Sequence, residues 1–255
     1  MTRFIVTENY DQMSEKAALL ILRQINKKDN SLLGLATGST PVGTYENLIK
    51  WNQQGLVDFA AVKTVSLDEY MGVDENDEQS YRWFMNDNFF NKVNIKIENT
   101  HIPMGKSGDI ELECRNYEDR INLLGGIDLQ LLGIGENGHI GFNEPTSFFE
   151  KHTHVVALND STRKANARFF ESVDKVPTHA ITMGIGVIMA ARRIVLVVNG
   201  SHKAQALYKS FFENVDPMFQ ASILQYHQDV TVVADQEAMQ VINDKKVVYN
   251  DFISL

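Results

Sequence analysis

Residues 127–145 read Ile127-Asp-Leu-Gln-Leu-Leu-Gly-Ile-Gly-Glu-Asn-Gly-His-Ile-Gly-Phe-Asn-Glu-Pro145, an apolar run that leads into a glycine-rich loop. The apolar run, 127–132, predicts a strand buried on both faces, as the strands of a parallel sheet are. The loop places an amide, an imidazole and a carboxylate within eight residues, at Asn137, His139 and Glu144. Loops on a rigid scaffold carry binding and catalytic side chains more often than core segments do. We therefore predict a functional site at the end of this strand.

The glycines of this loop, Gly133-x-Gly135-x-x-Gly138, also match the dinucleotide-binding fingerprint. That site needs the third glycine within the first turn of a helix. Residues 139–145 follow instead, and their glycine and proline make a poor helix start, so we reject a dinucleotide site. His139 with Glu144 suits an oriented general base, because imidazole titrates near neutrality and a carboxylate can fix its tautomer. The alternative is a buried histidine that bonds a backbone carbonyl.

Around this strand, short apolar runs alternate with longer amphipathic segments. The predicted strands cover 3–6, 32–36, 64–67, 100–102, 127–132, 154–158, 180–183, 194–198 and 230–233, with an added edge strand at 247–249. The predicted helices cover 14–28, 41–52, 81–90, 110–124, 161–170 and 202–212. This alternation predicts one doubly wound α/β domain over residues 1–255, with a mostly parallel sheet and helices on both faces. Such sheets bind ligands outside the carboxyl ends of their strands.

The segment Leu35-Ala-Thr-Gly-Ser-Thr-Pro41 runs from a predicted strand through a glycine turn into a predicted helix. Backbone N–H groups at such a helix start bind anions, and a phosphate monoester is the natural ligand. The segment is not a Walker A loop, because no Gly-Lys-Ser/Thr follows. An ordinary helix cap by Ser39 or Thr40 is an equally good interpretation. Arg168 and Lys203 are either phosphate ligands or surface charges.

Two adjacent carboxylates, Asp68 and Glu69, follow the predicted strand 64–67. One of them could face the cleft as a proton acceptor. Solvated surface charge or a carboxylate at a helix terminus is the alternative, and spacing alone favours it. The aromatic residues of the predicted helix 81–90 are expected in the core rather than on a binding surface.

Composition limits the classes of function. A balance of 24 Lys and Arg against 33 Asp and Glu gives a net charge of −9, which argues against a nucleic-acid surface. Cys114 is the only cysteine, so no intramolecular disulfide is expected. We find no signal-peptide pattern and no apolar run near the roughly 20 residues of a membrane span, so we expect a cytoplasmic protein. No ligand set recurs at metal-binding spacing, and we expect no metal.

Six motifs recur together in one known family. They are Thr37-Gly-Ser-Thr-Pro41, Leu67-Asp-Glu-Tyr70, Gly135-x-Asn-Gly-His-Ile-Gly-Phe-Asn-Glu-Pro145, Asn166-Ala-Arg-Phe-Phe170, Thr182-Met-Gly-Ile-Gly186 and Gly200-Ser-His-Lys-Ala204. In this order and spacing the chain resembles the glucosamine-6-phosphate deaminases nearly end to end. The resemblance implies ring opening, enolisation and deamination of glucosamine 6-phosphate to fructose 6-phosphate and ammonia, without a cofactor. It also implies a mobile lid over roughly residues 154–183.

The resemblance assigns roles to single residues. Asp68 would take the C2 proton, and His139 would accept the O1 proton during ring opening. Asn137 and Glu144 would hold and tune the histidine. The 6-phosphate would be bound by Gly38, Ser39, Thr40, Arg168 and Lys203. Remote binding of the phosphate would hold the reactive end of the sugar in place.

The chain departs from the family pattern at two places. Many members carry Asp at the position of Asn137, and an amide cannot hold negative charge, so Glu144 must stabilise an imidazolium more on its own. Members activated by N-acetylglucosamine 6-phosphate use serines and a basic pair where this chain has Phe148, His154 and Val156. We therefore expect no such activation, and a monomer.

Two other functions are weighed. A 6-phosphogluconolactonase has a related fold, but the Asp68-Glu69-Tyr70 segment and the full loop motif favour the deaminase. A sugar-phosphate sensor should carry a basic helix-turn-helix module. This chain begins directly with a predicted strand, and it keeps both Asp68 and His139, so we expect an enzyme.

Overall fold

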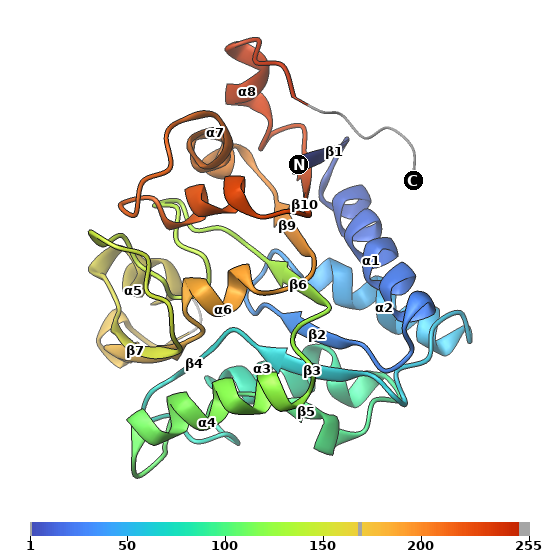
Figure 1. The fold of residues 1–255 in the computed structure, drawn as a ribbon, viewed down its shortest axis with the longest axis vertical. Helices are drawn as coiled ribbons and strands as arrows, with labels where there is room; N and C mark the ends of the chain where they lie inside the picture. Colours follow the sequence, from blue (N-terminus) through green and yellow to red (C-terminus); the bar gives the residue numbers. More distant parts are fainter. Residues whose placement is uncertain (1, 168–169, 250–255) are drawn as a thin grey trace.

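The computed structural model describes residues 2–167 and 170–249, and a seven-stranded parallel sheet forms its centre (Figure 1). The strands are β1 (Thr2–Thr7), β2 (Leu32–Leu35), β3 (Lys63–Ser66), β5 (Thr100–His101), β6 (Leu129–Leu132), β9 (Ile194–Val198) and β10 (Val230–Asp235). Their order is β1-β10-β9-β6-β2-β3-β5, and every neighbouring pair is parallel. The predicted doubly wound, mostly parallel α/β fold is confirmed.

Helices cover both faces of this sheet. Along β9, Ile194, Leu196 and Val198 pack into one apolar cluster, whereas Val195 and Val197 pack into the other. One face is covered by α1 (Tyr10–Lys27), α2 (Val42–Gln53) and α3 (Tyr81–Asn88). The other is covered by α4 (Ile110–Leu123), α6 (Ile185–Met189), α7 (Ala204–Phe212) and α8 (Gln240–Asp244). Burial on both faces explains why the strands are continuous apolar runs. None of the described helices is both long enough and apolar enough to cross a membrane.

The chain reverses its direction of winding between β2 and β6. From β2 it adds β3 and then β5 on one side, and it returns to the other side of β2 with β6. The loops after β2 and β6 therefore leave the sheet in opposite directions and open a crevice between them. The two glycine-containing segments, 36–41 and 133–141, lie at this switch point.

A second, three-stranded sheet stands beside the first. It consists of β4 (Asp68–Tyr70), β8 (His179–Thr182) and β7 (His154–Ala157), with β8 in the centre and both pairs antiparallel. The helix α5 (Asp160–Asn166) lies between β7 and β8 in the chain. The strands at 154–158 and 180–183 were predicted, but a short apolar run carries no information about which sheet its strand joins.

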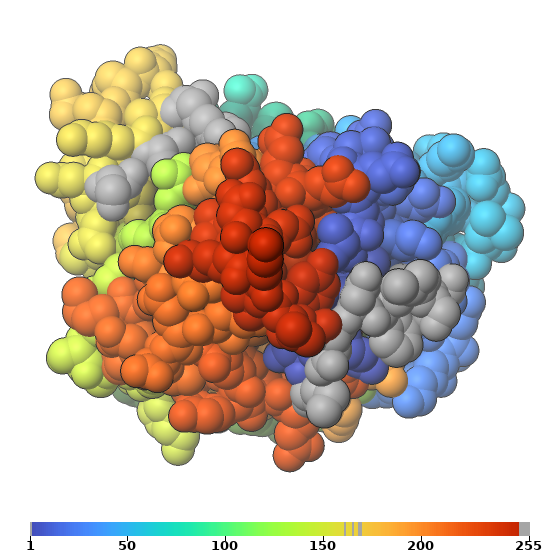
Figure 2. Space-filling model, turned by 90° about the horizontal axis from the view of Figure 1, so that it is seen from above, coloured from blue at the N-terminus to red at the C-terminus, as the bar shows by residue number. Residues whose placement is uncertain are grey.

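The predicted edge strand at 247–249 is wrong. These residues have no strand conformation, and the Tyr249 ring instead packs on Phe4 of β1, with 5.2 Å between the ring centroids. The chain reaches Phe4 shortly after α8, which ends at Asp244. Lys246, two residues further on, has a left-handed φ of 52°. Figure 2 shows α8, in red, lying over the middle of the molecule beside the blue N-terminal elements. The apolar pattern of this segment thus serves side-chain packing rather than strand pairing.

Gly34 allows β2 and β6 to lie side by side. It pairs with Gln130, and a Cβ at position 34 would overlap the buried Gln130 carboxamide. We expect Gly34→Ala to lower the free energy of unfolding by about 1–3 kcal/mol through overpacking. Adding Gln130→Ala should relieve the overlap, so the double variant should lose less than the sum of the single losses. Urea denaturation of the four chains measures this, and additive losses would contradict the overlap.

Candidate active site

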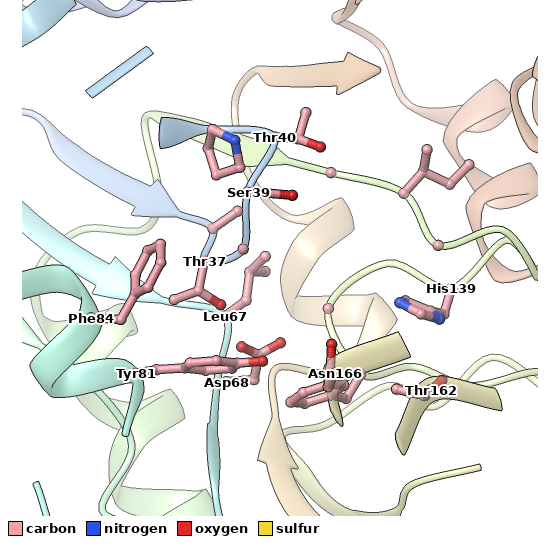
Figure 3. A pocket seen from close by; sticks show the side chains of 18 of the residues that line it. Thr37, Ser39, Thr40, Leu67, Asp68, Tyr81, Phe84, His139, Thr162 and Asn166 are labelled. Carbon is pink, nitrogen blue, oxygen red and sulfur yellow. The ribbon is translucent and has the colours of Figure 1, made fainter. Parts of the chain in front are cut away.

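A cavity of about 820 Å³ opens at the switch point of the large sheet. Its walls come from segments far apart in the sequence: 36–41 after β2, β4, 133–142, α5 and 199–203 after β9. Figure 3 shows labelled side chains from the first four of these segments, and from α3, around one common space. Eight of the nine predicted site residues lie in the described part of the chain. Glu144 lies behind the cavity wall, and the other seven line the cavity.

The glycine turn after β2 forms one wall. Gly38 adopts φ +95°, which favours glycine, and α2 then begins with Pro41 at the N-cap and no side-chain cap hydrogen bond. Thr40 therefore does not cap the helix. Its hydroxyl donates instead to Asn199 Oδ1 at 2.9 Å, which ties this turn to the loop after β9. Lys203, from the short 3-10 helix η5 (Ser201–Lys203), lines the same cavity.

Arg168, the other basic residue predicted at this wall, lies outside the described residues. Gly38, Ser39, Thr40 and Lys203 are thus brought together as predicted, and their role toward a phosphate stays a prediction.

The adjacent carboxylates Asp68 and Glu69 have different surroundings. Glu69 accepts hydrogen bonds from the backbone N–H groups of Tyr70, Tyr81 and Arg82, so it caps the start of α3. Asp68 lines the cavity and is 5% exposed. Burial, helped by the nearby negative charge of Glu69, raises the pKa of Asp68 to about 8. Asp68 thus faces the cleft and Glu69 is a carboxylate at a helix terminus, while the role of Asp68 as a proton acceptor stays a prediction.

His139 faces the cavity from the loop after β6. Burial lowers the pKa of His139, against the attraction of Glu144 and together with the repulsion of Lys203, so the imidazole is held neutral. Its Nδ1 lies 3.8 Å from Glu144 Oε2, too far for a hydrogen bond, and this buried nitrogen has no hydrogen-bond partner among the described residues. The expected carboxylate–imidazole pair is close together but not joined.

Glu144 is held by amides instead. Its Oε2 accepts from Asn137 Nδ2 at 2.9 Å and from Asn159 Nδ2 at 3.1 Å. Asn137 Oδ1 also accepts from the backbone N–H of His139 at 3.2 Å. Asn137 thus joins the Glu144 carboxylate to the backbone of His139. An aspartate at this position would place its own negative charge beside that of Glu144.

The glycines of the loop after β6 allow close contacts. A Cβ at Gly135 would overlap the His139 ring, and Gly138, at φ +84°, leaves room for the Phe219 ring. The Gly138 N–H donates to the Gly135 carbonyl at 3.0 Å to close a turn, and no helix begins within 133–145. These glycines fit an imidazole and an aromatic ring, which confirms that the loop is not a dinucleotide fingerprint.

Sequence reasoning missed part of the cavity wall. Tyr81, expected in the core, lines the cavity, and its hydroxyl donates to Tyr70 OH at 3.3 Å. Asn166 of α5 donates to the same Tyr70 oxygen at 3.0 Å. Thr162 of α5 also lines the cavity, and its buried hydroxyl has no hydrogen-bond partner among the described residues. Tyr70 and Asn166 lie within two of the six sequence motifs, and their presence there could have indicated that they line the cavity.

These features are those of an α/β enzyme with its active site at the switch point of a parallel sheet. The chain belongs to the family of glucosamine-6-phosphate isomerases and 6-phosphogluconolactonases, whose model matches residues 7–233.

Similar proteins cover nearly the whole chain. A glucosamine-6-phosphate deaminase of Clostridium botulinum (strain Alaska E43 / Type E3) is 53% identical over 95% of this chain and 98% of its own length. The solved structure of a monomeric glucosamine-6-phosphate deaminase is 46% identical, covers 94% of this chain and 99% of its own, and superposes with a TM-score of 0.92. A 6-phosphogluconolactonase from Trypanosoma brucei, 18% identical over 95% of this chain and 99% of its own with a TM-score of 0.76, shares the fold.

The raised pKa of Asp68 makes a prediction about stability. An acid with a higher pKa in the folded chain costs stability as the pH rises above its unfolded pKa, because the unfolded chain then loses its proton first. We therefore expect the stability gain of Asp68→Asn over the parent to grow with pH, from roughly 1 kcal/mol near pH 5 to roughly 5 kcal/mol near pH 8. Urea denaturation across this range measures the difference, and a difference that stays constant with pH would contradict it.

Proposed function

We propose that this protein converts glucosamine 6-phosphate and water to fructose 6-phosphate and ammonia. The observation that carries the proposal is the meeting of Asp68, His139 and the turn at Gly38 around one cavity, although they lie on three different strand ends. Curated relatives about 50% identical over nearly the whole chain support it, since they are glucosamine-6-phosphate deaminases. Because water displaces ammonia, we class the reaction as a hydrolysis.

The phosphate would bind at the turn after β2. The backbone N–H groups at Gly38, Ser39 and Thr40 precede α2, whose N-terminal end favours negative charge. Lys203 and Arg168 would add positive charge. Binding energy from this end of the sugar would hold C1 and C2 at the opposite side of the cavity.

Asp68 would move the proton between C2 and C1. With its pKa raised to about 8, Asp68 keeps a proton in the empty cavity at neutral pH. The substrate brings an ammonium group on C2, and a cation beside a carboxyl group favours its charged form. Binding would thus generate the base where it is needed. Asp68 would take the C2 proton to give an enolamine and return it to C1, and water would then release ammonia from the resulting imine.

His139 would open the sugar ring. Its lowered pKa keeps the imidazole neutral, so it can accept the proton from O1 and pass it to the ring oxygen as the bond from C1 to that oxygen breaks. The imidazolium that forms would be stabilised by Glu144, whose nearest oxygen is 3.8 Å from Nδ1. Residues 154–183 would close over the substrate as a lid, and α5 would bring Thr162 and Asn166 to it.

Lactone hydrolysis is the competing activity within the family. Solved lactonase structures share the fold but are less than 25% identical to this chain, so the likeness shows a common fold and not a common reaction. We expect ammonia release from glucosamine 6-phosphate and no hydrolysis of 6-phosphogluconolactone.

The decisive variant is Asp68→Asn. We expect kcat for ammonia release to fall by about 10²–10⁴-fold, because the proton acceptor is lost while the phosphate turn is unchanged. Inhibition by inorganic phosphate, measured with the residual activity, should stay as in the parent. Asp87→Asn, on the exposed side of α3, is the matched control and should retain full turnover. Substantial turnover by Asp68→Asn would rule out the assigned role.

We also propose that the enzyme is monomeric and lacks activation by N-acetylglucosamine 6-phosphate. The Phe148 side chain is exposed, and His154 Nδ1 lies 2.9 Å from the His152 carbonyl, so neither forms a basic or hydroxyl pocket. The rate should depend hyperbolically on glucosamine 6-phosphate, with or without the N-acetyl compound, and light scattering should give the mass of one chain. A sigmoidal curve that the N-acetyl compound makes hyperbolic would contradict this.

A further inference from the structure

Asn159 stands at the N-cap of α5 but does not cap it. Asparagine is favoured at this position because its side-chain oxygen accepts a backbone N–H of the first turn. Here Asn159 makes no such bond. Its side-chain amide donates to Glu144 Oε2 at 3.1 Å, and its backbone N–H lies 3.4 Å from Glu144 Oε1. A residue type suited to stabilising its own helix is thus turned toward the catalytic loop.

The oxygen that receives this amide is the one nearest to the imidazole. Glu144 Oε2 accepts from both Asn137 and Asn159, and it also lies 3.8 Å from His139 Nδ1. A carboxylate oxygen offers two lone pairs in its plane, and here two amides occupy them. The imidazole therefore has a carboxylate beside it with which it forms no hydrogen bond.

We propose that Asn159 is a positioning residue that withholds Glu144 Oε2 from His139 and so couples the placement of α5 to the proton affinity of the imidazole. The same helix presents Thr162 and Asn166 to the cavity. A ligand that moves α5 would therefore move Asn159 relative to Glu144. When the Asn159 amide withdraws, Oε2 becomes free to accept the His139 Nδ1–H, and the imidazolium is favoured. The inference rests on the proposed role of His139.

The ionisable groups near His139 lie on elements other than α5. In the part of the chain that the structure describes, the ionisable groups that line the cavity beside His139 are Asp68 and Tyr70 of β4, Glu78 and Tyr81 at the start of α3, Glu136 of the loop after β6, and His202 and Lys203 of η5. Glu144 acts on the imidazole from behind the wall. Among the described residues, α5 lines the cavity only with Thr162 and Asn166, neither of which titrates. A change at Asn159 thus alters the hydrogen bonding of Glu144 without removing a charge from the site.

The test is the titration of His139 in the Asn159→Ala chain. Two-dimensional ¹H–¹³C NMR follows the ring signals with pH, and the spectrum of His139→Gln assigns the His139 peak. We expect the His139 pKa to rise by about one unit, because a freed carboxylate oxygen forms a charge-assisted hydrogen bond with the imidazolium. The acid limb of kcat/KM should move to higher pH by the same amount, since His139 must be neutral to accept a proton.

Two further variants keep the test decisive. Asn159→Leu has nearly the same size and shape but neither an amide donor nor a charge, so it should raise the His139 pKa even if Asn159→Ala folds poorly. Lys164→Ala, on the exposed side of α5, should leave the titration unchanged. An unaltered His139 titration in both Asn159 variants would overturn the proposal. NMR titration needs no turnover, so this result is independent of whether the enzyme releases ammonia.

Discussion

The active site depends on the backbone of Leu67, which joins the two sheets. Its N–H donates to the Leu35 carbonyl beside the large sheet at 3.3 Å, and its own carbonyl accepts from Met183 N–H beside the small sheet at 2.7 Å. The chain therefore leaves β3 and enters β4 without a loop, and Asp68 follows directly. Buried backbone groups must be paired, so this junction cannot shift without leaving one of them unsatisfied. It fixes Asp68 against the switch point of the parallel sheet.

The same junction explains why Asp68 and Glu69 behave differently. Successive side chains of a strand point to opposite faces. One face of β4 meets the cavity, where Asp68 stays buried and keeps its proton. The other meets the start of α3, where Glu69 finds three backbone donors. Although burial raises the pKa of Glu69 as well, these hydrogen bonds oppose the rise. The neighbouring acids thus have different surroundings: Asp68 lines the cavity, and Glu69 holds the start of the helix that carries Tyr81.

Local patterns were sufficient to predict the strands of the large sheet, the switch-point loops and several of the residues that meet in the cavity, because parallel sheets place strand ends together. They were insufficient for Asp68 and Glu69. The pairing of β4 with β8, more than 100 residues later in the chain, decides which of these two side chains points into the cavity. Tyr81 was misplaced for a related reason: helical spacing identifies an apolar face but not whether that face meets a core or a cavity. At 247–249, an apolar pattern alone could not separate strand pairing from the packing of Tyr249 on Phe4.

Asn137 is the departure from the family pattern that the structure explains most directly. An aspartate at this position would place a second carboxylate 2.9 Å from Glu144 Oε2, and two like charges at that distance cannot both ionise easily. The amide of Asn137 removes this repulsion and donates a hydrogen bond to Glu144, whose charge acts on the imidazole. It also occupies the oxygen that His139 would use. The imidazole thus lies 3.8 Å from a carboxylate oxygen that two amides already occupy. Under the role proposed for His139, this arrangement of Asn137, Asn159 and Glu144 would set the acid-side pH dependence of the reaction, rather than a proton shared between two carboxylates.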